Sequence, residues 1–316
     1  MKQCLALALA ALLAACSSSS QHQSSTADAA ASTAPPAAAA SAAHAPIAED
    51  QPDQVVPPVS ASQMSAQRIE AAIKGSWRPA PDVARDPYRH PLKTLQFFGI
   101  RPDMTVIEIT PGGGWYARIL APLLRENGKY IAAEFAPTKG KEAKADDSHL
   151  RKLFASDPKV FGKARIVTMD ARHPVLGTSG SADMVLTFRN VHNWVQAGTA
   201  PAMFQAFYQV LKPGGVLGVV DHRAASGAAL AAVKGSGYLP QAYVTKLARA
   251  AGFILQASSD VNANPRDTRD YPKGVWTLPP TLALGDKDKA KYQAIGESDR
   301  MTLRFVKPAG NGDGAR

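Results

Sequence analysis

Residues 106–117 read Val106-Ile107-Glu108-Ile109-Thr110-Pro111-Gly112-Gly113-Gly114-Trp115-Tyr116-Ala117. The apolar run at the start of this stretch suits an inner strand of a parallel sheet. Three consecutive glycines then let a ligand approach the backbone without meeting a Cβ, and the free N–H groups of a following helix favour a carboxylate or phosphate. The stretch therefore predicts a strand, a ligand-binding loop and a helix, and its surroundings must identify the ligand.

The first residues of the chain have the features of an export signal. Lys2 gives a positive start, residues 5–13 are apolar but too short to span a bilayer, and the sequence then reads Leu13-Ala14-Ala15-Cys16. These four residues resemble the lipobox of bacterial lipoproteins, which implies that residues 1–15 are removed and that the thiol of Cys16 is lipidated. The alternative is an ordinary signal peptide cut at an Ala-x-Ala-like site. Because Ser17 is not the aspartate that retains such lipoproteins at the inner membrane, we expect an outer-membrane anchor facing the periplasm.

Composition divides the remaining chain into a tether and one domain. Residues 16–60 are rich in Ser, Ala and Pro and have almost no large apolar side chain, so they are predicted to be a disordered tether. Residues 61–316 are enough for a single α/β domain with a sizeable core. The chain has two cysteines, Cys4 and Cys16, so the domain itself has no thiol for a disulfide or a Cys-based metal site.

The predicted domain is distinctly basic. When the one lysine and four acidic residues of the first 60 positions are set aside, 35 Lys and Arg face 22 Asp and Glu, a net charge of +13. Anionic headgroups, nucleic acid, an acidic substrate or a merely solvated surface would each fit this charge. The basic residues lack the interleaved aromatics of a single-strand binder, which argues against nucleic acid.

Strands and helices alternate along the domain. Strands are predicted at 104–110, 129–135, 165–169, 182–188, 216–221 and 253–261, and helices at 65–74, 91–98, 115–124, 141–154, 200–211 and 241–251. This alternation indicates a mainly parallel sheet covered by helices on both faces. The last strand, 301–307, follows a long Pro-rich segment rather than a crossover helix, which leaves an antiparallel orientation open.

Two classes of cofactor compete for the glycine loop. The pattern Gly112-x-Gly114-x-x-Ala117, with Glu134 twenty residues beyond Gly114, fits a dinucleotide and hence a nicotinamide-dependent oxidoreductase. Against this, Glu108 stands inside the strand, where a carboxylate is expensive to bury unless a cation or several donors meet it. S-adenosylmethionine offers an ammonium group for Glu108, a carboxylate for the helix N-terminus and a ribose for Glu134.

With these residues the chain resembles a class I S-adenosylmethionine-dependent methyltransferase from about residue 90 to its end. The first motif of that family, acidic-x-Gly-x-Gly-x-Gly, maps onto Glu108, Thr110, Gly112 and Gly114, with Thr110 replacing the first glycine. The turn before the fifth strand, residues 211–215, matches a second signature of the family. Three further segments resemble a bacterial group of predicted methyltransferases: 188–194, 262–265 and 276–280.

The resemblance implies a Rossmann-like class I methyltransferase fold. Its seven-stranded, mostly parallel sheet has the order 3-2-1-4-5-7-6, with the last strand antiparallel and helices on both faces. S-adenosylmethionine would then lie across the ends of strands one, two and four, with Glu134 accepting the ribose hydroxyls and Asp170 the adenine amino group. The residues implied to hold the cofactor are Glu108, Thr110, Gly112, Gly113, Gly114, Tyr116, Glu134, Asp170 and Asn190.

Candidate catalytic groups follow strands four and five. His192 is the preferred base, because an imidazole titrates near neutrality, and Asn190 lies beside it in an unusually polar segment. His222, between Asp221 and Arg223, is an alternative base or substrate-orienting residue, and any of these could instead only cap a turn. Residues 262–280 have the polar variety of a lid or substrate wall.

No metal site is predicted, because the five histidines outside the tether show no HxxxH spacing and the Asp286-x-Asp288 segment lacks the glycine of a calcium loop. The leading hypothesis is a methyltransferase acting on a small molecule or an envelope component. The alternatives are a non-catalytic envelope lipoprotein that keeps the fold for ligand binding, and the oxidoreductase, which Glu108 disfavours. The sequence assigns neither a methyl acceptor nor an oligomeric state, and the compartment raises a question of supply, since S-adenosylmethionine is made in the cytoplasm.

Overall fold

The computed structural model describes residues 60–136 and 143–309, with the side chains of the second range described from residue 149. The predicted signal peptide, the lipidation residue Cys16 and the tether up to residue 59 lie outside the described residues.

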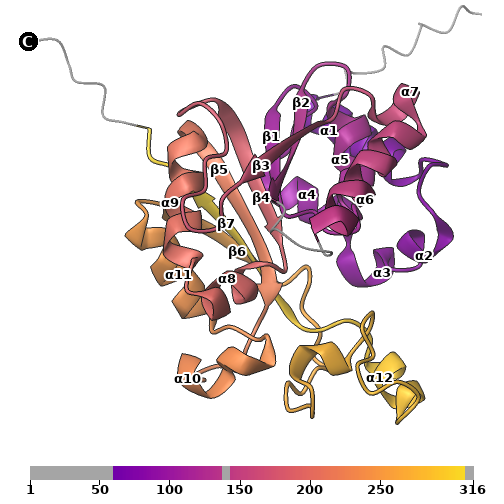
Figure 1. Ribbon diagram of the computed structural model, residues 1–316, viewed down its shortest axis with the longest axis vertical. Coiled ribbons are helices and arrows are strands. Elements are labelled where there is room, and N and C mark those ends of the chain that lie inside the picture. Colours follow the sequence, from indigo (N-terminus) through magenta and orange to yellow (C-terminus); the bar gives the residue numbers. More distant parts are fainter. Residues whose placement is uncertain (1–59, 137–142, 310–316) are drawn as a thin grey trace, which may run out of the picture. The chain divides into compact units, whose positions relative to one another are not determined.

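Seven strands form one sheet. They are β1 (Thr105–Ile109), β2 (Lys129–Phe135), β3 (Arg165–Met169), β4 (Ala182–Phe188), β5 (Leu211–His222), β6 (Ile254–Ser259) and β7 (Arg300–Val306). Their order is β3-β2-β1-β4-β5-β7-β6 (Figure 1). The pairs from β3 to β5 are parallel, whereas β7 runs antiparallel to both β5 and β6. The predicted fold class and strand order are therefore confirmed, including the reversed last strand.

Helices cover both faces of the sheet because the side chains of each strand alternate between two cores. In β1, Ile107 and Ile109 face one core, and Val106 faces the other. The first core is closed by α8 (Val191–Ala197), α9 (Ala200–Val210) and α11 (Gln241–Ala250). The second is closed by α1 (Ala61–Ile73), α4 (Pro91–Phe98), α5 (Ala117–Leu124), α6 (Ala143–Ser156) and α7 (Pro158–Phe161), and the two groups flank the sheet in Figure 1.

Local signals set the ends of these helices. Pro91 starts α4 in its first turn, and Gly99 ends it in the left-handed conformation, as the sequence predicts. Helix α1 starts earlier than predicted because Ser60 and Gln63 form a capping box: the Ser60 hydroxyl accepts from the Gln63 N–H, and the Gln63 side chain accepts from the Ser60 N–H.

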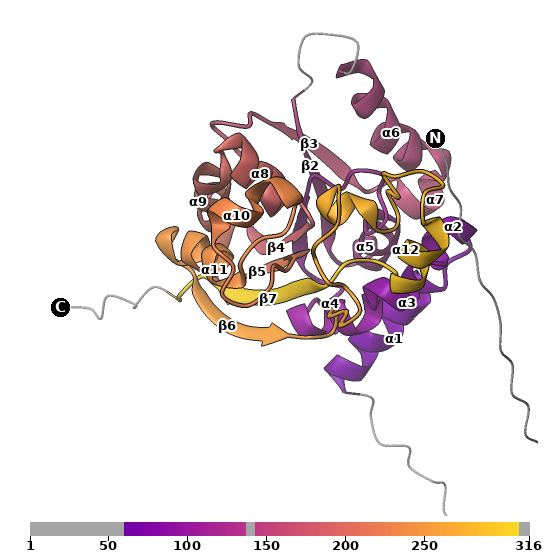
Figure 2. The same cartoon turned by 90° about the horizontal axis from the view of Figure 1, so that it is seen from below.

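Short helices that the sequence patterns do not predict gather where the parallel strands end. They are α2 (Ala80–Val83), α3 (Asp86–Arg89), α8, α10 (Leu230–Val233) and α12 (Lys289–Ile295), together with the 3-10 turns η1 (Lys234–Ser236) and η2 (Gly274–Thr277). Each spans seven residues or fewer, too short for a helical period to show. Figure 2 views the molecule from this side, where α8, α10 and α12 lie over the strand ends.

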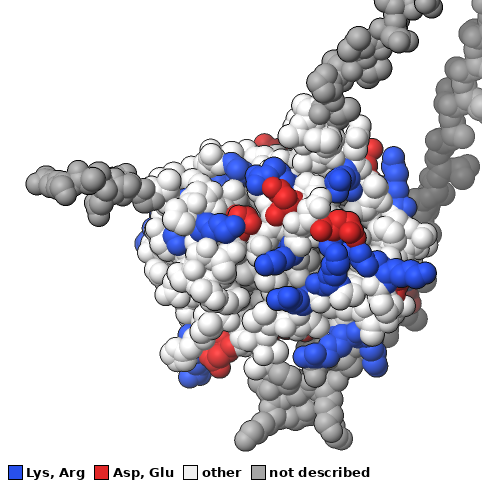
Figure 3. All heavy atoms as spheres, turned by 90° about the horizontal axis from the view of Figure 1, so that it is seen from above, with Lys and Arg blue, Asp and Glu red and all other residues white. Residues whose placement is uncertain are grey.

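Two further observations concern the surface. Within the described part of the chain, no helix combines the length and the apolar character that crossing a bilayer would require. On the face seen in Figure 3, basic side chains are interrupted by acidic and uncharged ones.

Candidate functional site

A cleft of about 330 Å³ opens where the parallel strands end. It is within the range of small-molecule sites, at its lower end. The glycine loop forms one part of its wall through Thr110, Pro111, Gly112 and Gly113. The other lining residues come from the segments after β4 and β5 and from the N-terminal and C-terminal thirds of the domain: Asp82, Arg85, Arg89, Trp115, Phe188, Arg189, Asn190, His192, Asn193, His222, Val275, Trp276, Pro279, Pro280, Thr281, Glu297 and Ser298.

The three glycines have different roles in the loop. Gly112 (φ +58°) and Gly114 (φ +78°) adopt left-handed conformations that favour glycine. A Cβ on Gly114 would also lie 2.7 Å from Leu153 Cδ2, so this glycine is required by packing and does not line the cleft. A Cβ on Gly112 or Gly113 would meet nothing within 4 Å. The space beside these two residues is therefore open to a ligand.

Thr110 stands where the methyltransferase motif has a glycine, and its backbone adopts a conformation that favours glycine. Its φ is +46°, in the left-handed region that a β-branched residue rarely adopts. Its hydroxyl is buried without a hydrogen-bond partner among the described residues, although the residue lines the cleft. Strain and an unsatisfied hydroxyl thus coincide at the loop, a combination that is typical of a functional site.

Asn190 connects the two loops that form the cleft. Its Nδ2 donates to the carbonyl oxygens of Ile109, at 3.0 Å, and Thr110, at 3.4 Å. The same nitrogen lies 3.3 Å from Thr187 Oγ1. The amide N–H₂ therefore holds the glycine loop against the start of α8, and only the amide oxygen is left for a ligand or substrate.

Glu108 is buried beneath the glycine loop. Tyr130 Oη donates to its Oε2 at 2.6 Å, and only 2% of the residue is exposed. Burial raises the pKa of this carboxyl to about 8, against the lowering effects of the Tyr130 hydrogen bond and the charge of Arg89. Glu108 is therefore mostly protonated at neutral pH and is not among the residues that line the cleft, so its contact with a ligand ammonium group stays a prediction.

Three further residues implied to hold the cofactor also lie outside the cleft lining. Tyr116 is buried, with its ring stacked on Phe188 at a centroid distance of 3.5 Å, so it supports a lining residue from behind. Asp170 Oδ1 accepts from the N–H groups of Arg172 and His173 at 2.7 and 2.8 Å, so one of its oxygens caps its own turn. Glu134 lies near the end of β2 and is partly buried. The cofactor roles of these residues stay predictions.

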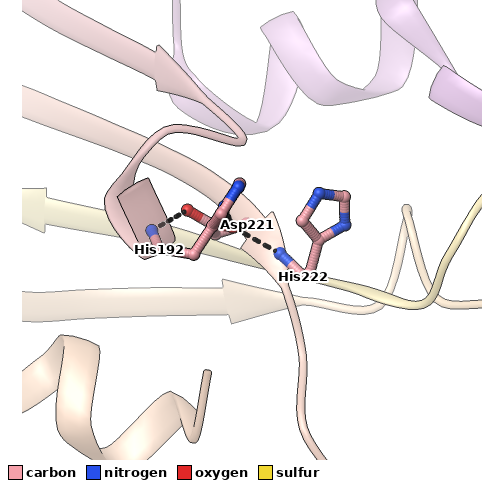
Figure 4. A group of neighbouring side chains, drawn as sticks. All are labelled: His192, Asp221 and His222. Carbon is pink, nitrogen blue, oxygen red and sulfur yellow. Dashed lines mark hydrogen bonds and ion pairs between the residues drawn. The ribbon is translucent and has the colours of Figure 1, made fainter. Parts of the chain in front are cut away.

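His192 and Asp221 form a buried pair that faces the cleft. His192 Nδ1 lies 2.9 Å from Asp221 Oδ1, and the His192 N–H donates to Asp221 Oδ2 at 3.2 Å. Figure 4 shows Asp221 between His192 and the backbone of His222, whose N–H also donates to Oδ1 at 2.7 Å. Burial would raise the pKa of Asp221, but the charge and hydrogen bond of His192 and the other donors hold it below its usual value.

This arrangement fixes the state of the His192 ring. An ionised carboxylate only accepts hydrogen bonds, so the Nδ1 of His192 must carry the proton. Nε2 is then the basic nitrogen, and Asp221 stabilises the imidazolium that forms when Nε2 takes a proton. The pair has the chemistry of a general base.

His222 differs from His192 in its environment. Its Nδ1 shares a hydrogen bond with Ser298 Oγ at 2.6 Å, and its ring lies 5.1 Å from that of His192. Burial, helped by the nearby charges of His192, Arg189 and Arg300, lowers the pKa of His222 well below its usual value, although Asp221 opposes this. His222 therefore remains neutral and is better suited to accept or donate a hydrogen bond than to act as the base.

The fold also assembles a group that could ligate a metal, which the sequence analysis did not predict. One ligand atom from each of His192, Asp221 and His222 lies within 4.8 Å of the others. The residues come from α8 and from the end of β5, so spacing along the chain could not reveal them. The hydrogen bonds described above already use both oxygens of Asp221 and the Nδ1 atoms of both histidines, an arrangement that also fits a hydrogen-bonded base.

The predicted lid contributes in part to the site. From residues 262–280, Val275, Trp276, Pro279 and Pro280 line the cleft. Asn262 is instead buried, where its Nδ2 donates to Thr94 and Thr302, each at 3.0 Å. This segment is thus a wall at one end and a structural anchor at the other.

Several charged lining residues were not predicted. Arg89 and Glu297 are in contact although 208 residues separate them in the chain. Arg85 also reaches Glu297, and Arg189 was noted only as part of the polar segment after β4. No local motif marks such a contact, because it depends on how α3 and the segment before β7 meet.

Neither a protein-family model nor a curated protein matches this sequence. Solved structures do match, among them a putative sarcosine dimethylglycine methyltransferase from Galdieria sulphuraria, with 12% identity over 77% of this chain and 98% of that one and a TM-score of 0.50. A SAM-dependent methyltransferase from Aquifex aeolicus (14% identity, 77% and 98%, TM-score 0.46) and the [4+2]-cyclase SpnF (17%, 80% and 98%, TM-score 0.48) are also similar. With the strand order described above, the chain has the Rossmann-like fold of class I methyltransferases. At these identities the comparison shows the fold alone.

Proposed function

We propose that this protein is an S-adenosylmethionine-dependent methyltransferase that acts on a small molecule or an envelope component. The observation that carries the proposal is that one cleft is lined by both the open glycine loop and His192, which the buried Asp221 carboxylate holds through a hydrogen bond. A ligand-binding fold without chemistry would not need a carboxylate that fixes a histidine as a base.

The glycine loop leaves open space that fits the cofactor. Gly112 and Gly113 leave open space where a side chain would stand, and the cleft continues from them to His192. They would hold the cofactor, which supplies a methyl group on a sulfonium and keeps the electron pair of the broken C–S bond on sulfur. Tyr116, Glu134, Asp170 and Glu108 remain proposed cofactor-binding residues on the resemblance alone.

The chain's own groups would act on the methyl acceptor. His192 Nε2 takes the proton from an acceptor O–H or N–H, and Asp221 stabilises the resulting positive charge. His222, held neutral, orients the acceptor through a hydrogen bond. Trp276 packs at the edge of the His192 ring, with a centroid distance of 6.1 Å, and helps to exclude water.

Isothermal titration of the purified protein with S-adenosylmethionine and S-adenosylhomocysteine tests the cofactor. Saturable binding of both is expected, and no binding at millimolar concentration would reject the proposal. For catalysis, His192→Ala should keep this binding and lose methyl transfer to an acceptor found with methyl-labelled cofactor. Full transfer by the variant would remove His192 from the mechanism.

A second candidate is a non-catalytic protein that uses the cleft only for binding. Two observations favour it: Thr110 replaces a glycine at a strained position, and Asp170 caps its own turn outside the cleft lining. The cofactor titration and the His192→Ala transfer assay distinguish the two candidates, because the non-catalytic candidate requires that no methyl transfer depends on His192.

We also propose that the protein is exported and held on the envelope by lipid at Cys16, as the Leu13-Ala14-Ala15-Cys16 sequence supports. Mass spectrometry of the native, membrane-extracted protein should find a lipidated Cys16 at the N-terminus. An intact Met1 would contradict this, and a co-purified cofactor would show that the compartment supplies one.

A further inference from the structure

Four arginine side chains surround one carboxylate beside the cleft. Arg85 Nε donates to Glu297 Oε1 at 2.7 Å, and Arg89 Nε lies 3.3 Å from both oxygens of Glu297. Arg300 Nη1 donates to Oε2 at 2.9 Å, and Arg189 Nη1 is 3.9 Å from the same oxygen. We call these five residues the arginine cluster.

The charges of the arginine cluster do not balance, because four guanidinium groups face a single carboxylate. Asp82 also lines the cleft, but it is paired with Arg118, whose Nη1 lies 3.3 Å from Asp82 Oδ2. Burial and neighbouring arginine charges lower the pKa of Arg89 to about 9 and that of Arg189 to about 10. The protein thus holds excess positive charge on two buried arginines, Arg89 and Arg300, and on two that are only partly exposed, Arg85 and Arg189.

A second network in the same domain shows that this imbalance is local. Arg223 bonds Asp299 at 2.9 Å and Asp260 at 2.7 Å, and Arg269 bonds Asp299 at 2.6 Å. Here two arginines meet two aspartates, and the hydrogen bonds that Arg223 donates to Asp299 and Asp260 raise its pKa against the effect of burial. None of these four residues lines the cleft. Of these two networks, the one with excess positive charge is the one beside the cleft.

The arginine cluster also has donors without acceptors. Arg89 is only 2% exposed, and its Nη2 has no hydrogen-bond partner among the described residues. The same is true of Arg85 Nη2 and Arg300 Nε. Buried polar groups are almost always paired, so these three nitrogens are donors that a further acceptor at the cluster could use.

The position of the cluster identifies what it would hold. Arg189 directly follows β4, and Glu297 stands shortly before β7, so both lie at the strands that flank β5. The end of β5 carries Asp221 and His222, and Arg85, Arg89, Arg189 and Glu297 line the same cleft as His192. The glycine loop follows β1, and Arg89 lies beside its end, with the guanidinium 4.6 Å from the centroid of the Trp115 ring. On the other side of the cluster, Glu297 precedes Ser298, whose hydroxyl shares a hydrogen bond with His222. The cluster therefore lies between the glycine loop and the base, and it borders the base through Ser298.

We propose that the arginine cluster binds an anionic group, a carboxylate or a phosphate, of the molecule that accepts the methyl group. This inference rests on the proposed function and names its substrate class: an acidic small molecule with an O–H or N–H that His192 reaches while its anion is held by Arg85, Arg89 and Arg189. Guanidinium groups are suited to this task because they match both anions in a bidentate geometry.

Anion binding to the full-length protein tests the proposal. Succinate and inorganic phosphate are titrated separately, with and without saturating S-adenosylhomocysteine, at an ionic strength kept constant with sodium chloride. At least one anion should bind saturably to the protein, and the two arms show whether carboxylate or phosphate is preferred. If neither anion binds, the proposal is wrong.

Three variants locate the binding. Arg89→Gln and Arg189→Gln should each weaken anion binding by roughly ten-fold or more, the effect of losing one charged hydrogen bond. Arg189 is the less buried of the two, so its variant serves if Arg89→Gln does not fold. Arg269→Gln, which removes an ion pair away from the cleft, is the matched control and should bind as the wild type does. An equal loss in the control would overturn the assignment.

A parallel measurement separates acceptor from cofactor. S-adenosylhomocysteine has a carboxylate and 5′-methylthioadenosine does not, so their affinities for Arg189→Gln are compared. The two affinities should change little and by the same factor. A loss confined to S-adenosylhomocysteine would assign the cluster to the cofactor carboxylate and overturn the proposal. If neither nucleoside binds the wild type, the proposed function fails, and the anion titration without nucleoside still decides the cluster.

Discussion

The buried carboxyl of Glu108 should make the protein less stable as pH rises, and Glu108→Gln should remove this effect. Burial raises the pKa of Glu108 from 4.5 to about 8. The folded protein therefore binds this proton more tightly than the unfolded chain does. Its contribution to stability is fully present below pH 4.5 and is lost as pH rises through 8.

The size of the effect follows from the shift. At pH 7 the free energy of unfolding of Glu108→Gln should exceed that of the wild type by roughly 3 kcal/mol. This follows because the wild type loses about 1.4 kcal/mol for each pH unit above the pKa of the unfolded chain. Near pH 4.5 the difference should vanish. Gln preserves the shape of the protonated carboxyl and an oxygen that accepts from Tyr130, so little else should change.

Urea unfolding of both proteins at a series of pH values from 5 to 8 measures the effect. The wild-type free energy of unfolding should fall relative to that of Glu108→Gln as pH rises. Glu126→Gln is the control, at an exposed carboxyl whose pKa the Arg125 hydrogen bond lowers, and here the wild type should hold or gain stability relative to the variant as pH rises. The reasoning is refuted if Glu108→Gln is less stable than the wild type at pH 8, or if the difference between them does not depend on pH.

Four further substitutions probe the loop and the base. Gly114→Ala should lose roughly 1–3 kcal/mol of stability in urea unfolding, because its Cβ would strike Leu153 from a left-handed backbone, whereas Gly113→Ala should fold normally but bind S-adenosylhomocysteine more weakly by calorimetry. Equal stability of the two variants would contradict the loop geometry. Thr110→Gly should stabilise the protein by about 1 kcal/mol, since the relief of left-handed strain outweighs the added chain entropy, and a loss of stability would mean that the hydroxyl is partnered. In ¹⁵N NMR spectra His192 should be protonated on Nδ1 at neutral pH and should change tautomer in Asp221→Asn, and Nε2 protonation in the wild type would exclude the proposed base.

The fold was largely predictable because its strands carry local signals. The apolar run of β1, the glycines after it and the turn before β5 each belong to one short segment, and the family resemblance supplied the strand order that periodicity cannot. The observed strand ends differ from the predicted ones where hydrogen bonding decides them. For example, the strand predicted at 216–221 is β5, which already pairs with β4 at Leu211.

The site was predictable only where one segment carries the chemistry. His192 was found because it stands in a polar segment after a strand, and Asp221 and His222 because they end the next one. Their pairing was not, since it depends on the register of α8 against β5. No sequence pattern predicts the contact of Arg89 with Glu297, because the two residues lie near opposite ends of the domain's sequence.

A crystal structure of the protein with S-adenosylhomocysteine tests the central claim most directly. We expect the ligand in the cleft, with its backbone contacts at Gly112 and Gly113 and its sulfur facing His192 Nε2. A ligand bound elsewhere, or in the cleft with its sulfur turned away from His192, would contradict the assignment of this site to methyl transfer.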